Sequence, residues 1–117
     1  HSLGVITLLH FLQRHEYQNI GGMILVSGFS GFISDSSVLN SYITKSKADT
    51  NYFKGIKKKL VYLSDNDDLV PPKLTIELAK EIDAPHITVP NGGHFLGREG
   101  YTKFPQLVDS LKEMLND

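Results

Sequence analysis

The stretch from Leu60 to Pro72 reads LVYLSDNDDLVPP and contains the features that indicate the fold. It begins with a short continuous apolar run, which is the pattern of a strand buried on both faces. A polar run rich in Asp and Asn follows, and these residues favour turns. Pro72 then suits the first turn of a helix, where its missing N–H costs nothing. The stretch therefore predicts a buried strand that leads through a polar loop into a helix.

The same alternation of strand and helix continues on both sides of this stretch. The apolar run Met23–Val26 predicts an earlier strand, and His86–Val89 predicts a third, weaker one. The polar and aperiodic segment from Ile33 to Asn51 predicts one or two short surface helices. Amphipathic helices are predicted by apolar residues at helical spacing over Leu3 to about Tyr17, Pro72 to near Ala84, and about Phe104 to Met114.

Strands that alternate with helices indicate an α/β protein with a parallel sheet and helices on both of its faces. The chain has 117 residues, a formal net charge of −1 and no cysteine. A disulfide framework, a thiolate zinc site and a cysteine nucleophile are therefore excluded. The balanced charge gives no indication of a nucleic-acid or membrane surface, and no apolar run approaches the ~20 residues of a membrane span. We expect a cytoplasmic protein.

Three chemically suited residues are expected at the carboxyl ends of strands: Asp67 and His94 follow predicted strands, and Ser2 would follow a strand missing from this chain. Ligands of open parallel sheets bind beyond the carboxyl ends of the strands. The first residues, His1-Ser2-Leu3-Gly4, resemble the second half of a G-x-S-x-G turn, which carries a nucleophilic serine between a strand and a helix. Asp67 follows the strand Leu60–Leu63, and His94 follows His86–Val89 after two glycines. A serine hydroxyl needs an imidazole to accept its proton, and the imidazole needs a carboxylate to orient it. The order Ser, Asp, His therefore predicts a catalytic triad.

Each of these residues also has a structural alternative. Ser2 suits the N-cap of a helix. Asp67 lies in a run of turn-forming residues in which Asp65 and Asp68 are further candidates for the acid. His94 could be an ordinary histidine of a surface loop. The chain contains no H-E-x-x-H pattern, so we expect no zinc site.

Several segments together resemble the small serine hydrolases of the YdeN and retinoblastoma-binding-protein-9 family. They are His1–Gly4, Leu25–Phe29, Ser64–Pro71 and Gly92–Phe95. The resemblance implies a single α/β-hydrolase domain of which residues 1–117 form the C-terminal part, with the N-terminal strands missing. The family pattern D-x-x-[VL]-P places the acid four residues before Pro71, which selects Asp67 over its neighbours.

The resemblance also implies a role for each residue of the triad. Ser2 is the expected nucleophile, Asp67 the orienting acid and His94 the base. The backbone N–H of Leu3 is one expected donor to the oxyanion, and the second would come from a loop after an early strand that this chain does not contain. No metal ion or organic cofactor is expected.

We therefore expect a serine hydrolase, similar to a carboxylesterase, that cleaves a small ester, thioester or amide through an acyl-serine intermediate. Two other functions stay open. One is a non-catalytic protein-binding scaffold on a hydrolase fold, because fold does not determine function and one family member is named for a protein partner. The other is an acyltransferase with the same triad. Phe29, Phe32 and Phe95 flank the predicted site in sequence and could line an acyl pocket or pack in the core.

Overall fold

The sheet has the predicted strands in the predicted parallel arrangement. The computed structural model describes residues 1–17, 19–33 and 37–116. Strands β1 (Met23–Val26), β2 (Lys59–Ser64) and β3 (His86–Val89) form one sheet in the order β1-β2-β3. Both pairings are parallel, so β2 is hydrogen-bonded along both of its edges. The chain therefore has the α/β arrangement that its sequence predicts.

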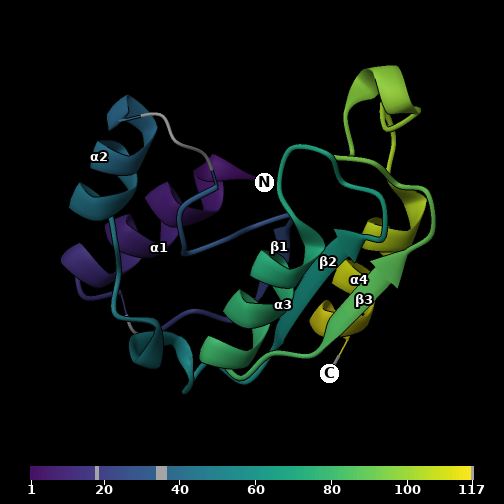
Figure 1. Ribbon diagram of the computed structural model, residues 1–117. Coiled ribbons are helices and arrows are strands. Elements are labelled where there is room, and N and C mark those ends of the chain that lie inside the picture. The colour runs from purple at the N-terminus through teal and green to yellow at the C-terminus, as the bar shows by residue number, and fades with distance from the viewer. Residues whose placement is uncertain (18, 34–36, 117) are drawn as a thin grey trace.

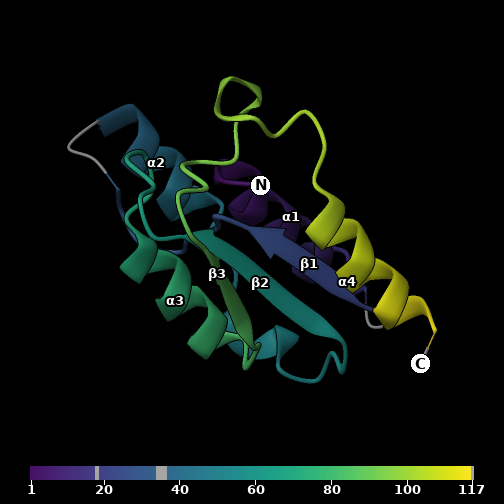
Figure 2. The ribbon, with the colours of Figure 1, turned by 90° about the vertical axis from the view of Figure 1, so that its right-hand side faces the viewer.

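Helices cover both faces of the sheet (Figures 1 and 2). Helices α1 (Leu3–Arg14) and α3 (Pro72–Glu81) lie on one face, and α4 (Pro105–Leu115) lies on the other. The polar segment between β1 and β2 contains α2 (Ser37–Lys45) and the short 3₁₀ helix η1 (Thr50–Phe53), as its composition predicts, although its residues 34–36 lie outside the described part. A second 3₁₀ helix, η2 (Gly97–Glu99), follows β3.

The main core lies between the sheet and helices α1 and α3. Side chains of a strand alternate between the two faces of the sheet, so Leu25 and Val61 point to this core. Its buried members are Val5, Leu9, Met23, Leu25, Phe53, Val61, Leu78, Ala79 and Ile82. Tyr62 points to the opposite face, where its hydroxyl group lies 2.7 Å from the Ser110 hydroxyl of α4. Because its side chains alternate between the two faces, β2 contacts the helices on both sides of the sheet.

Helix α1 ends at Arg14, three residues before the predicted end at Tyr17. The reason is a Schellman-type closure, in which the N–H of Tyr17 donates to the carbonyl of Leu12 at 3.0 Å. The closing residue is Glu16, at a φ of +55°, where glycine or asparagine is usual. Helix α3 ends in a similar way with Asp83 at a φ of +58°. The sequence contains no glycine at these positions, so the usual stop signal is absent.

A buried lysine holds the amino-terminal end of β2. Lys59 is only 7% exposed, and its ammonium group donates to three carbonyl oxygens. The acceptors are those of Phe53 at 2.9 Å, Lys54 at 3.0 Å and Ile82 at 2.6 Å. Because a lysine ammonium group has three donors, its hydrogen-bonding capacity is fully used. Lys59 therefore joins η1, β2 and the end of α3.

Replacement of Lys59 by methionine is expected to destabilise the fold. Lys59→Met keeps an unbranched side chain but leaves the three carbonyl acceptors without this donor, at a cost of about 1–3 kcal/mol for each one that stays buried. The free energy of unfolding, measured by urea denaturation, should fall by several kcal/mol. Lys57→Met, at an exposed position nearby, should change it by less than about 0.5 kcal/mol. Equal stability of Lys59→Met and the unaltered protein would contradict the structural role of Lys59.

The same lysine should affect the pH dependence of stability. Removal from water lowers the pKa of Lys59 below 10.5, and the carboxylate of Asp83 opposes this only in part. The unfolded chain therefore binds more protons at this lysine than the folded chain does between the lowered pKa and 10.5. Over that interval the free energy of unfolding of the unaltered protein should rise with pH relative to that of Lys59→Met. A flat or falling difference would show that the pKa of Lys59 is not lowered.

Candidate active site

Ser2 lies at the start of α1, beside the carboxyl end of β1. Its backbone N–H donates to the carbonyl of Val26 at 2.9 Å, which ties the turn to the end of that strand. Its backbone has a φ of +57° and a ψ of −131°, a region that non-glycine residues rarely adopt and that costs about 1–3 kcal/mol. The side chain makes no capping hydrogen bond to the helix, so the N-cap alternative for its hydroxyl group is wrong. The strained turn instead directs the hydroxyl group toward His94.

Asp67 lies in the loop after β2, and its carboxylate is held on both oxygens. Oδ1 accepts hydrogen bonds from the backbone N–H groups of Leu69 and Val70, each at 2.9 Å. Oδ2 lies 2.8 Å from Nδ1 of His94. The Asp67 side chain is 3% exposed, whereas Asp68 is exposed to solvent. Of the candidate acids, Asp67 is therefore the one that meets the histidine.

His94 lies between the other two residues and contacts each with a different ring nitrogen. Nε2 is 2.9 Å from the hydroxyl oxygen of Ser2, and Nδ1 is 2.8 Å from the carboxylate of Asp67. Because a carboxylate only accepts hydrogen bonds, Nδ1 carries the proton. The lone pair of Nε2 can then accept the hydroxyl proton of Ser2. This arrangement suits proton transfer away from Ser2, as the predicted triad requires.

The three residues come together at one edge of the sheet. In Figure 1 the N-terminus and the loops after β2 and β3 all lie at the end toward which the strand arrows point. Ser2, Asp67 and His94 are thus brought from three distant positions in the sequence to the carboxyl ends of the strands, where open parallel sheets bind ligands.

The residues before Asp67 fasten the loop that carries His94. The Ser64 hydroxyl group donates to the carbonyl of Gly93, and the side-chain oxygen of Asn66 accepts from the N–H of Gly93 at 2.7 Å. Asp65, an alternative candidate for the acid, accepts from the N–H of Asn91 at 2.9 Å. This positioning function was not predicted, although the polar run Ser64–Asp67 at the end of a strand is a usable signal.

Gly93, before His94, and Gly4, two residues after Ser2, differ in whether the structure requires a glycine. Gly93 has a φ of +59°, so a side chain there would be strained as well as obstructed. A Cβ atom built on Gly4, by contrast, meets no atom within 4 Å among the residues considered beyond its own helical backbone and chain neighbours. The described part of the chain therefore offers no steric reason for glycine at that position.

Leu3, the predicted oxyanion donor, follows Ser2 directly at the start of α1. Leu3 is the first residue of α1, and the first N–H groups of a helix have no acceptor within the helix. The partial positive charge of the helix N-terminus also favours an anion there. The N–H of Leu3 adjoins Ser2 in sequence, as in the oxyanion hole of nucleophile elbows.

The three phenylalanines near the site differ in their surroundings. Phe29 is fully buried in a second apolar cluster with Ile6, Ile43 and Val70, so core packing applies to it. Phe95 is 7% exposed and stacks on Phe104 with ring centroids 5.2 Å apart. Phe32 is 59% exposed. Of these three phenylalanines, Phe32 alone is freely accessible to a ligand.

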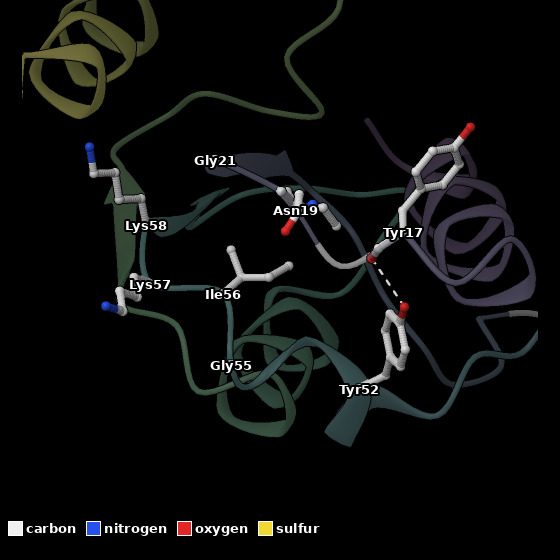
Figure 3. Close-up of a pocket in the computed structure, with 9 residues that line it drawn as sticks. Tyr17, Asn19, Gly21, Tyr52, Gly55, Ile56, Lys57 and Lys58 are labelled. Atoms are coloured by element: carbon white, nitrogen blue, oxygen red, sulfur yellow. Dashed lines mark hydrogen bonds between the residues drawn. The ribbon is translucent and has the colours of Figure 1, made fainter.

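One hollow lies away from these residues. It has a volume of about 530 Å³ and lies where the chain enters β1 and β2, at the amino-terminal ends of the strands (Figure 3). A hydrogen bond of 3.0 Å from the Tyr52 hydroxyl group to the Tyr17 carbonyl closes one side. Its lining residues are Tyr17, Asn19, Ile20, Gly21, Tyr52, Gly55, Ile56, Lys57 and Lys58. Ser2, Asp67 and His94 are therefore not among the residues that line this hollow.

Among residues 1–17, 19–33 and 37–116, no group of three or more His, Asp or Glu side chains is placed to hold a metal ion. No helix in this part of the chain has both the length and the apolar character needed to cross a membrane.

The chain is similar to known proteins over nearly its whole length. The family model for serine hydrolases matches residues 1–113. The chain is 36% identical over 112 residues to YdeN of Bacillus subtilis (strain 168), which is named as a candidate hydrolase. This match covers 95% of the chain and 59% of that protein. The crystal structure of the ydeN gene product from B. subtilis superimposes with a TM-score of 0.89 at 34% identity, over 100% of this chain and 63% of that one.

The chain thus spans about three fifths of the length of these relatives. Over that span the match to the family model, the identity and the structural similarity all agree, and the fold is of the α/β-hydrolase type. The chain belongs to the serine hydrolase family.

Proposed function

We propose that this chain carries the catalytic triad of a hydrolase that cleaves a small ester, thioester or amide through an acyl-serine intermediate. The main support is the continuous path of hydrogen bonds from the Ser2 hydroxyl group through His94 to Asp67, with distances of 2.9 and 2.8 Å. Membership of the serine hydrolase family supports the same reaction class.

In the first half of the reaction, Oγ of Ser2 attacks the carbonyl carbon of the substrate. Its proton passes to Nε2 of His94 as the new bond forms, and the ring becomes positively charged. The Asp67 carboxylate at Nδ1 stabilises this charge and keeps the ring in the required tautomer. The negative charge that develops on the carbonyl oxygen would lie near the N–H of Leu3. The leaving group then takes the proton from Nε2 and departs.

In the second half, water replaces the leaving group. His94 accepts a proton from the water, whose oxygen attacks the acyl carbon, and the proton then returns to Oγ of Ser2 as the acid product leaves. All proton transfers use the same imidazole, and the proposed mechanism needs no metal ion or organic cofactor. Small carboxylic esters of the kind that carboxylesterases hydrolyse are the simplest substrates of this class.

Fluorophosphonate labelling tests the proposed nucleophile. Fluorophosphonates react with an activated serine, so the protein should be labelled on Ser2 and Ser2→Ala should not be. Ser30→Ala is the matched control, because Ser30 donates to Glu81 at 3.0 Å and takes no part in the proposed triad. Labelling that persists in Ser2→Ala would reject Ser2, and complete absence of labelling in the folded protein would favour a non-catalytic scaffold.

A pair of neighbouring substitutions tests the proposed acid. Asp67→Asn should lower kcat for a p-nitrophenyl ester by roughly 10⁴-fold, because the amide favours the wrong tautomer of the imidazole. Asp68→Asn removes the same charge one residue away, at an exposed position, and should leave kcat within about twofold. The assignment would be wrong if the larger loss followed Asp68→Asn. Analysis of products with added alcohols or amines would show whether the acyl group is transferred to acceptors other than water.

A further inference from the structure

The loop that carries His94 has an unusual backbone on both sides of the histidine. Gly93 has a φ of +59°, and Phe95 has a φ of +56°. This conformation is costly for a bulky residue such as phenylalanine, by about 1–3 kcal/mol, and persists only where the surroundings impose it. Phe95 itself is held by stacking on Phe104 and by an edge contact with Tyr101. These ring contacts do not explain what holds the backbone of His94.

The carboxylate of Glu99 binds this backbone directly. Its Oε1 atom accepts hydrogen bonds from the N–H of His94 at 2.9 Å and from the N–H of Leu96 at 3.2 Å. The two donors lie on either side of Phe95, whose left-handed conformation makes alternate N–H groups converge. Such a concavity of backbone N–H groups, called a nest, is an anion-binding feature. Here the anion is a side chain of the same loop.

The second oxygen of Glu99 lies against the residue before the histidine. A Cβ atom built on Gly93 would be 1.6 Å from Oε2. The carboxylate therefore fills the space that any side chain at this position would need. Glu99 thus contacts the chain both before and after the histidine.

Glu99 is itself fixed by the turn in which it lies. Its N–H donates to the carbonyl of Leu96 at 2.9 Å, which closes η2. Gly100 follows with a φ of +95°. Leu96, which accepts this hydrogen bond from the backbone of Glu99, also donates its N–H to the Glu99 carboxylate. The Glu99 side chain therefore has little freedom to leave the nest. The loop from Gly93 to Glu99 is therefore held together by hydrogen bonds that meet at the Glu99 carboxylate.

We propose that Glu99 is a positioning residue for His94. Its carboxylate holds the backbone of the loop so that the imidazole stays within hydrogen-bond distance of both Ser2 and Asp67. This inference rests on the proposed function, in which His94 carries the protons. Asp67 orients the ring through Nδ1 but does not hold the Cα atom of His94. A displacement of about 1 Å in a catalytic group can cost on the order of 10²-fold in rate.

The charge of Glu99 should contribute as well as its shape. Hydrogen bonds to an ionised acceptor are roughly twice as strong as those between neutral groups. Glu99→Gln keeps an acceptor oxygen of similar geometry but loses the charge, whereas Glu99→Ala loses the acceptor altogether. The kcat of Glu99→Gln should therefore be lower than that of the unaltered protein, and the kcat of Glu99→Ala should be lower still.

The test compares these variants with a matched pair at Glu77, an exposed glutamate of α3. With a p-nitrophenyl ester, Glu99→Ala should lower kcat by about 10- to 100-fold with little change in KM, because ring placement and not substrate binding is altered. Glu99→Gln should recover part of that loss. Glu77→Ala and Glu77→Gln should match the unaltered protein. Unchanged kcat in both Glu99 variants would overturn the proposal, as would a rise in KM alone.

Two additional measurements keep the test decisive. If Glu99→Ala melts below the assay temperature, Glu99→Gln decides: a kcat equal to that of the unaltered protein would overturn the proposal, and a several-fold loss in the folded variant would support it. The proton NMR signal of His94 Nδ1–H, which requires no turnover, should broaden or exchange faster in Glu99→Gln and stay unchanged in Glu77→Gln. An unchanged signal in both would overturn the proposal.

The proposed function can fail separately. Labelling that survives in Ser2→Ala would reject the triad assignment, whatever the state of Glu99. The NMR signal would still report whether Glu99 positions the ring.

Discussion

The two-sided pairing of β2 determines where the proposed catalytic side chains lie. Val89 of β3 pairs with Ser64, so β2 and β3 end together, and Val26 of β1 pairs with Tyr62, two residues earlier. All pairings are parallel, and the loops after the strands therefore leave from one edge of the sheet. A shift of register on either side of β2 would move one loop by about 3.3 Å per residue, more than a hydrogen bond of 2.8–2.9 Å tolerates.

The same edge concentrates backbone strain. Of the described non-glycine residues with positive φ, Ser27 and Asn91 come just after β1 and β3. Ser2 is hydrogen-bonded to the last residue of β1, and Phe95 follows His94 in the loop after β3. Most are held by a bond at or beside the strained residue: Ser2 donates to the Val26 carbonyl, and the N–H of Asn91 donates to Asp65. The strain is thus supported locally, by polar groups that emerge from the ends of neighbouring strands. Strained backbone of this kind persists only where the surroundings over-determine it.

The sequence predicts the strands well, because buried parallel strands are continuous apolar runs. It also indicates candidates for the proposed triad, because ligands of such sheets bind beyond the strand ends. It predicts less where a residue acts through its backbone. Helix α1 ends early because Glu16 adopts a conformation that composition does not indicate. Asp67 could be separated from Asp65 and Asp68 only by family resemblance, since all three suit a turn. The contact of Glu99 with the backbone of His94 could not be predicted, because the nest that binds its carboxylate forms only when Phe95 has a positive φ.

Burial alone does not distinguish a reactive base from a structural one in this chain. Lys59 is 7% exposed and His94 is 4% exposed, and both lie at ends of the sheet. The nitrogen of Lys59 faces three carbonyl oxygens, which can only accept, so all of its donors are used and none of its partners can react. His94 has a carboxylate on one nitrogen and a hydroxyl group on the other, so one partner fixes the proton while the other can give one up. The chemical nature of the partners, rather than the degree of burial, is therefore what singles out His94 as the centre of the proposed reaction.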